Sequence, residues 1–255
     1  VASVTAVAFP DLDLDLGDLG GTVTWSPPAS TYQVQNYEVY LAESSAGLGR
    51  SHVGSLVLGT NTVAITPDQP AMSYNNLLVY TASSFVEQTT PTALTIVDYV
   101  IDVTALTLQD DDLDELELGG KITWSPPQEP TRVYEYSIHF ALDAVGLNRS
   151  QLGVVTPSVT PGLTLLNLPA DVVLGDWTHI VMFARSVLAE QTTPAGVAAI
   201  VDNAVLVTSF YFRDVDLDLG DIGGLIWWQA PIHASMAARY NVYLGASVSG
   251  SGKSF

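Results

Sequence analysis

Apolar and polar residues alternate along much of this chain, which is the pattern of a β-strand with one buried face. Turn-forming residues separate the alternating segments, and no window has the 3.6-residue period of an amphipathic helix. In the first hundred residues the expected strands are 4–9, 22–25, 34–42, 53–58, 62–65, 77–81 and 94–97. A proline-bounded turn is expected at 66–70. The pattern therefore predicts an all-β fold.

One acidic stretch occurs three times, at residues 11–21, 110–120 and 214–224, and each copy ends in a Gly-Gly pair. Within a copy, acidic and apolar residues alternate, so we expect the stretch to continue the preceding strand. The copies are separated by 99 and 104 residues. This period is far longer than that of helical solenoids and matches one small β-sandwich.

The repeat predicts three tandem domains, at residues 1–99, 100–203 and 204–255. The third is expected to be incomplete, because Lys253 lies where Arg50 and Arg149 lie in the first two repeats, after about three of seven strands. An incomplete sandwich exposes strand edges and half of its core. Either the natural chain continues, which is the commoner arrangement, or another chain supplies the missing strands.

Motifs at strand ends resemble those of fibronectin type III domains. They are Trp25-Ser26-Pro27-Pro28 with Tyr37-Glu38-Val39-Tyr40, then Trp124-Ser125-Pro126-Pro127 with Tyr136-Ser137-Ile138-His139, and finally Trp228 with Tyr240-Asn241-Val242-Tyr243. The resemblance implies tandem seven-stranded β-sandwiches, the last one incomplete. The acidic stretch departs from ordinary members of that family. Acid-rich arrays without cysteine are similar to those in large surface proteins of aquatic single-celled eukaryotes, which implies an extracellular or cell-surface location.

The formal net charge is −19, from 27 acidic and 8 basic residues, and 14 of the acids lie in the three acidic stretches. Phosphate backbones and anionic lipid surfaces would be repelled, so we expect no nucleic-acid partner. No apolar run reaches the length of a membrane span. The chain has no cysteine, which excludes a disulfide scaffold and a thiolate metal site.

Carboxylates on alternate residues of one strand would repel one another by roughly 0.6 kcal/mol per neighbouring pair in water. Calcium binds about six to eight oxygen atoms and tolerates irregular geometry, so we expect one calcium ion per repeat. The candidate ligands are Asp11, Asp13, Asp15 and Asp18 in the first copy, Asp110, Asp112, Asp114 and Glu117 in the second, and Asp214, Asp216, Asp218 and Asp221 in the third. The alternative is an edge strand whose acids face water and block edge-to-edge pairing.

The fibronectin-type resemblance implies that the first acidic stretch lies at the end of its domain from which the chain continues. The linker acids Asp98 and Asp102, and loops of the next repeat around Pro126 and Glu190, would then lie nearby. A cation bridging these groups would stiffen the junction between repeats.

Three further features recur or carry a modification signal. The segment 87–91, Glu-Gln-Thr-Thr-Pro, recurs letter for letter at 190–194, as a turn before the last strand or as a contact or glycan loop. Arg50, Arg149 and Lys253 occupy one equivalent position and can pair with acids of the same repeat or of a neighbouring chain. Asn148 begins the only N-glycosylation sequon, so glycans are possible partners.

No catalytic constellation is visible in the sequence. The four histidines show no ligand or triad spacing, and there is neither a nucleophile elbow nor a phosphate-binding glycine loop. We therefore expect not an enzyme but a structural protein, a repeat-array subunit of a surface fibre or filament that self-associates end to end or by strand complementation. The alternative is an adhesin or carbohydrate-binding module, to which the outer ring of the Trp227-Trp228 pair would contribute.

Overall fold

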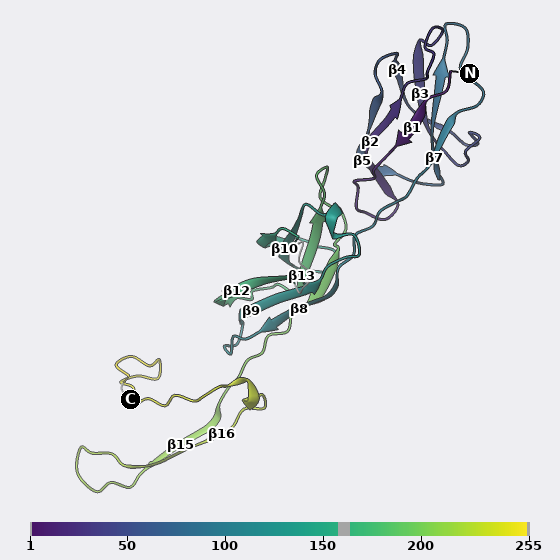
Figure 1. Cartoon of the computed structure of the whole chain (residues 1–255). Coiled ribbons are helices and arrows are strands. Elements are labelled where there is room, and N and C mark those ends of the chain that lie inside the picture. Colours follow the sequence, from purple (N-terminus) through teal and green to yellow (C-terminus); the bar gives the residue numbers. More distant parts are fainter. Residues whose placement is uncertain (1, 158–163, 254–255) are drawn as a thin grey trace. The chain divides into compact units, whose positions relative to one another are not determined.

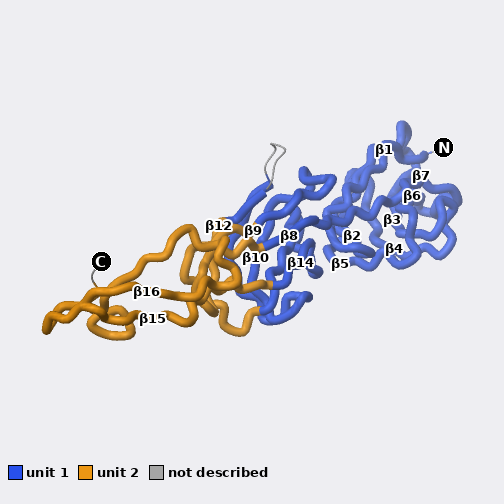
Figure 2. Tube along the Cα trace, turned by 90° about the horizontal axis from the view of Figure 1, so that it is seen from below, with its two compact units in different colours: residues 1–107, 123–166, 178–199 blue, residues 108–122, 167–177, 200–255 orange. Residues whose placement is uncertain are grey.

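The computed structural model describes residues 2–157 and 164–253. This part of the chain is all-β, with sixteen strands and two short 3-10 turns (Figure 1). It divides into two compact units, which Figure 2 colours separately. Unit 1 comprises Val1–Thr107, Thr123–Leu166 and Thr178–Ala199, and unit 2 comprises Leu108–Ile122, Asn167–Trp177 and Ile200–Phe255.

The first repeat lies entirely in unit 1 and has seven strands: β1 (Thr5–Ala8), β2 (Asp18–Ser26), β3 (Asn36–Ala42), β4 (Ser51–Val57), β5 (Thr62–Pro70), β6 (Asn76–Ala82) and β7 (Thr92–Thr95). They form a three-stranded sheet in the order β1-β2-β5 and a four-stranded sheet in the order β4-β3-β6-β7. The observed pairs in both sheets are antiparallel.

The two sheets of the first repeat share one hydrophobic core. Leu19, Val23 and Trp25 of β2 are buried with Tyr37 and other side chains of β3 and β6. The rings of Trp25 and Tyr37 meet edge to face at a centroid distance of 5.4 Å. Buried residues alternate with exposed ones along β2 from Gly21 to Ser26, as the period-2 pattern predicts.

The acidic stretch does not continue a strand, so that expectation was wrong. Residues 9–17 form a loop, and β2 begins at Asp18 and runs through the Gly-Gly pair. Gly21 has a φ of +147°, and a Cβ there would lie 2.5 Å from the carbonyl oxygen of Pro10. The expected turn at 66–70 was also wrong, because β5 extends to Pro70 and pairs with Asp18 through an irregular register.

The second repeat contains β8 (Thr104–Asp110), β9 (Glu117–Ser125), β10 (Glu135–Ala141), β11 (Ser150–Val155), β12 (Thr164–Val173), β13 (His179–Arg185) and β14 (Gly196–Ala199), with the 3-10 turn η1 (Pro130–Arg132). Their sheet orders, β12-β9-β8 and β11-β10-β13-β14, repeat those of the first seven strands. The Trp124 and Tyr136 rings are 5.7 Å apart, which reproduces the Trp25–Tyr37 contact.

In the third repeat, β15 (Thr208–Asp214) and β16 (Gly224–Gln229) form a two-stranded antiparallel sheet, followed by η2 (Ala234–Met236). The Trp228 and Tyr240 rings are 5.6 Å apart, at the positions of the earlier Trp–Tyr pairs. Most large apolar side chains of this part are exposed to solvent, including those of Trp227 at 63% and Trp228 at 37%. The alternation of side chains along a strand predicts one ring of the Trp227-Trp228 pair in the core and the other outside, but neither ring is buried.

Candidate functional site

Each acidic stretch folds into the same loop, which we call the acidic loop (residues 11–18, 110–117 and 214–221). Its first aspartate uses one carboxylate oxygen to accept N–H groups two and nine residues later. These bonds link Asp11 to Asp13 and Gly20, Asp110 to Asp112 and Gly119, and Asp214 to Asp216 and Gly223, at 2.9 to 3.3 Å. Aspartate side chains commonly compete with strand pairing in this way, which explains the loop.

The second aspartate of each loop continues the pattern. Asp13, Asp112 and Asp216 each accept the N–H of the residue two positions later, at 2.9 to 3.1 Å. In the first two copies the other oxygen accepts an N–H from the facing strand, namely that of Asp68 in β5 for Asp13 and that of Asp171 in β12 for Asp112. Both donors have a positive φ, of 60° and 62°.

The last residues of the first and second repeats are hydrogen-bonded to the acidic loop of the same repeat. Asp98 accepts the N–H of Gly17 at 2.9 Å, and Tyr99 donates its N–H to Asp11 at 3.1 Å. In the second copy, Asp202 accepts the N–H of Leu116 at 2.8 Å and Asn203 donates to Asp110 at 2.9 Å. The expected proximity of the acidic loop to Asp98 is thus confirmed, and it arises from hydrogen bonds between protein groups.

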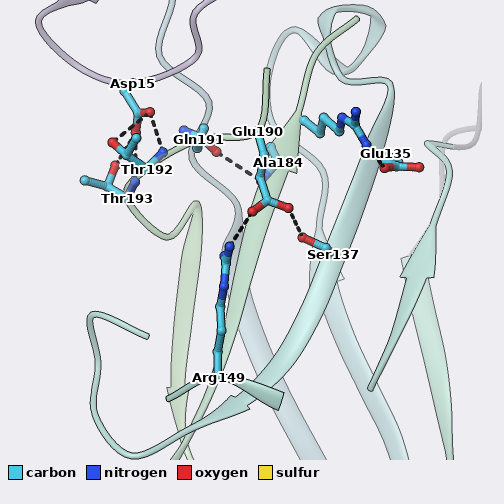
Figure 3. A network of polar contacts seen from close by, with 10 residues as sticks. Asp15, Glu135, Ser137, Arg149, Ala184, Glu190, Gln191, Thr192 and Thr193 are labelled. Atoms are coloured by element: carbon cyan, nitrogen blue, oxygen red, sulfur yellow. Dashed lines mark hydrogen bonds and ion pairs between the residues drawn. The ribbon is translucent and has the colours of Figure 1, made fainter. Parts of the chain in front are cut away.

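The third aspartate of the first loop, Asp15, is bound by the second repeat (Figure 3). Thr192 donates its N–H and its hydroxyl to one oxygen, and Thr193 donates both groups to the other, at 2.5 to 3.2 Å. Asp15 is 2% exposed. Four donors on one carboxylate compensate its desolvation and fix its orientation.

The residues beside Asp15 complete this junction. Leu14 is 2% exposed, and its carbonyl oxygen accepts the side-chain amide of Gln191 at 2.7 Å and the N–H of Ile101 at 3.1 Å. Gln191 is held in turn by the N–H of Ala184, which donates to its side-chain oxygen at 3.1 Å. The recurrent segment 190–194 is therefore a contact loop as well as a turn. The expected contact near Glu190 is found, although it is made by the three residues that follow it.

Burial and neighbouring charges shift several carboxyl pKa values in the acidic loops. Burial raises the pKa of Asp11 to about 6, against the opposing effect of its backbone donors. Burial also raises the pKa of Asp18, and Asp13 and Asp15 add to that shift. The N–H groups of Asp171 and Asp114 lower the pKa of Asp112. Backbone N–H groups thus stabilise the first two aspartates of the loop, whereas the last acid, Asp18 in the first copy, lies close to other negative charges.

Four carboxylates of the second repeat converge within 4.8 Å of one another: Asp112, Asp114, Glu117 and Asp171. We call this the carboxylate cluster. Desolvation and then the nearby charges of Asp171, Asp114 and Asp112 raise the pKa of Glu117. The cluster can hold a metal ion, since carboxylate oxygens are the preferred ligands of hard cations.

The structure brings three of the twelve predicted ligands together in this cluster: Asp112, Asp114 and Glu117. Within residues 2–157 and 164–253 the others form no group of comparable density. In the first copy, Asp15 turns to Thr192 and Thr193 instead. In the third copy all four candidate acids are exposed. Asp171 was missed, because it lies 54 residues beyond Glu117 and outside the repeated stretch.

The recurrent basic residues pair within their own repeats, as one of the two interpretations predicts. Arg50 contacts Glu87 and Arg149 contacts Glu190, each at 2.7 Å. Each guanidinium also lies over an aromatic ring, Tyr40 at 4.4 Å and Phe183 at 4.1 Å. Lys253 lies over Tyr243 at 5.1 Å. The two arginines thus hold Glu87 and Glu190, which begin the two Glu-Gln-Thr-Thr-Pro segments.

A scan against protein-family models and a search of curated proteins both return no match to this chain. In the described part of the chain, neither short helical turn has the length needed to cross a membrane. Asn148 lies exposed in the turn between β10 and β11, with a φ of 52°. Its modification remains a prediction.

Proposed function

We propose that this chain is a structural protein, a segment of a fibronectin type III-like repeat array in an extracellular or cell-surface fibre. In this proposal each repeat is a spacer, and the acidic loop is the connector that fixes its angle to the next repeat. The observation that carries the proposal is the Asp15 carboxylate of the first repeat, which is buried against four donors of the second. A flexible tether between independent domains would not require such a contact.

The linker supports the same proposal. The Asp98 carboxylate accepts a hydrogen bond from the first acidic loop, and the backbone N–H groups of Tyr99 and Ile101 donate to that loop. The connection between the repeats is therefore tied to the loop at three residues. The equivalent bonds of Asp202, Asn203 and Val205 to the second loop support one connector per repeat. A repeated connector of fixed geometry is what a load-bearing or length-defining array requires.

X-ray scattering of the chain in solution tests this function. We expect Asp15→Asn to broaden the distribution of interatomic distances, because the amide places N–H donors opposite the donors of Thr192 or Thr193. Asp176→Asn, which changes an exposed acid of the second repeat outside the three acidic loops, is the matched control and should leave the distribution unchanged. Identical broadening by both variants, or none by either, would remove the basis for a stiff connector.

We further propose that the ion suited to the carboxylate cluster is calcium, which would stiffen the second acidic loop. Four carboxylates at close range supply the hard, irregular oxygen set that calcium accepts. Without a cation, Asp112, Asp114, Glu117 and Asp171 repel one another. Calcium would thus act on the second loop as the threonine pair acts on Asp15 in the first.

An adhesin or carbohydrate-binding module is the second candidate, favoured by one observation. Tyr211 of β15 pairs directly with Trp227 of β16, and both rings are more than half exposed. Exposed aromatic pairs of this kind can stack on sugar rings. Binding of the chain to an immobilised glycan panel, lost in Trp227→Ala, would support this candidate over a purely structural role.

A further inference from the structure

The Gln-Thr-Thr segment that binds Asp15 has a second copy in the first repeat, which we call the socket (Gln88, Thr89 and Thr90). The surrounding loop has the same internal bonds in both repeats. Ser83 and Ser186 each donate their N–H to the residue three positions later, and Gln88 and Gln191 each donate theirs back to β6 or β13, at 2.9 to 3.0 Å. The socket is therefore formed before any partner binds.

The side-chain amide of Gln88 and the N–H and hydroxyl groups of Thr89 and Thr90 have no acceptor among the described residues. In the second repeat the same groups of Gln191, Thr192 and Thr193 all bind Leu14 or Asp15. Thr89 and Thr90 are exposed, and no hydrogen bond of theirs occurs in the described part of the chain. A cavity of about 390 Å³, lined by Ala2, Gln33, Val34, Glu87 and Gln88 among others, lies next to them.

The residues that line this cavity correspond, one repeat later, to residues of the second repeat that surround the first acidic loop. Ala2, Gln33 and Gln88 correspond to Ile101, Arg132 and Gln191 of the second repeat. All three of those residues donate hydrogen bonds to the first loop, Arg132 to the carbonyl oxygen of Asp11 at 3.2 Å. Phe85 at the socket is 93% exposed, whereas its counterpart Leu188 is 38% exposed and contacts the position of Gly20. Among the described residues, no acidic loop covers the first repeat as the first loop covers the second.

The third acidic loop carries the carboxylate acceptor that would satisfy the donor groups of the socket. Its residues 216–221, Asp-Leu-Asp-Leu-Gly-Asp, are identical to residues 13–18. Its internal bonds match those of the first loop, so Asp218 stands where Asp15 stands. Leu217 is 97% exposed, against 2% for Leu14, and Asp218 is exposed as well. The second loop fits less well, since Glu115 follows its Asp114 in place of leucine.

We infer that the acidic loop 214–221 of one copy of this chain docks into the socket of a second copy, with Asp218 bound by Thr89 and Thr90 and Leu217 in the adjoining cavity. The inference rests on the connector role proposed above and names its partner. The two surfaces differ, so each copy offers one loop and one socket. Such a head-to-tail contact leaves both ends open and adds copies in a line.

Sedimentation of the whole chain over a wide concentration range tests this docking. We expect the unmodified chain to self-associate, and both Asp218→Ala and the double variant Thr89→Asp/Thr90→Asp to be monomeric. A mixture of the two variants should form one-to-one complexes, because the first retains its socket and the second its loop. Both sites are exposed, so unchanged circular dichroism is expected to show intact folding. Asp176→Ala, which removes an exposed acid outside the three acidic loops, is the charge-matched control.

The inference is overturned if the unmodified chain stays monomeric up to about 1 mM, the weak end of specific association. It is also overturned if the variants associate as the unmodified chain does, or if the mixture does not associate. If scattering shows a stiff junction between the first two repeats but the chain is strictly monomeric, the docking proposal fails and the proposed function stands. Loss of that junction effect would sink the proposed function instead.

Discussion

The carboxylate of Asp15 accepts the backbone N–H of Thr192 at 2.6 Å, although 177 residues separate the two in sequence. The bond joins the acidic loop of one repeat to the Gln-Thr-Thr segment of the next. Charge-assisted hydrogen bonds of this kind contribute about 1.5 to 3 kcal/mol each. The pair therefore places a charge-assisted hydrogen bond of the junction on two residues from adjacent repeats.

Replacing the threonine hydroxyls should loosen the junction. In Thr192→Val/Thr193→Val we expect faster hydrogen exchange at Ile101 and Gly17, whose N–H groups bind Leu14 and Asp98, because two of four donors to Asp15 are lost. Thr89→Val/Thr90→Val is a matched control with the same sequence change. Equal protection of Ile101 in both double variants would contradict the assigned role of Thr192 and Thr193.

The second glycine of each Gly-Gly pair is expected to be intolerant of a side chain. Gly21→Ala would place Cβ 2.5 Å from the Pro10 carbonyl oxygen at a φ of +147°, so we expect a loss of about 2 to 4 kcal/mol in the free energy of unfolding. Gly17→Ala has a positive φ but open space, and should cost only about 1 kcal/mol. Chemical denaturation measures both. Equal losses would mean that the contact with Pro10 is unimportant.

His139 should make the second repeat sensitive to acid. Burial, and then the charge of Arg149, lower its pKa in the folded state. The unfolded chain then binds more protons, so the stabilisation is complete above the unfolded pKa near 6.5 and is lost as the pH falls through the lowered folded value. His139→Tyr restores the residue type of Tyr40 in the first repeat and should flatten the decline in unfolding free energy between pH 7.5 and 5. An unchanged slope would exclude His139 as its source.

The carboxylate cluster should bind calcium through the second repeat alone. We expect Asp114→Asn to weaken calcium binding about tenfold or more, since it removes one charged ligand of four. Asp15→Asn is the matched change in the first loop and should leave the affinity unaltered. Calorimetric titration of the metal-free chain measures both. Equal weakening by the two variants, or no heat in the unmodified chain, would contradict the calcium proposal.

Much of the first repeat could be predicted from its period-2 pattern, because packing between sheets selects alternating apolar residues. Strands were predicted near β1, β3, β4 and β6, and the aromatic pair of Trp25 and Tyr37 lies in the core. The acidic stretch has the same period yet forms a loop, since aspartate side chains satisfy the backbone N–H groups that a strand would pair. Alternation alone does not distinguish these two outcomes.

The junction could be predicted only in part. The letter-for-letter recurrence of 87–91 at 190–194 marked a contact loop, but its partner Asp15 depends on how one repeat follows another in space. The sequence contained one weak indication of Asp171, because it occupies the position in the second repeat that Asp68 occupies in the first. Long-range contacts of this kind are set by the tertiary fold and leave little trace in local pattern.

The central claim is that Asp15 fixes the second repeat to the first. The chain has no cysteine, so spin labels can be placed at single exposed sites, such as Leu48→Cys in the first repeat and Val145→Cys in the second. Pulsed electron spin measurement of the distance between them should give a narrow distribution that broadens markedly in Asp15→Asn. A distribution of the same width in both proteins would contradict the claim.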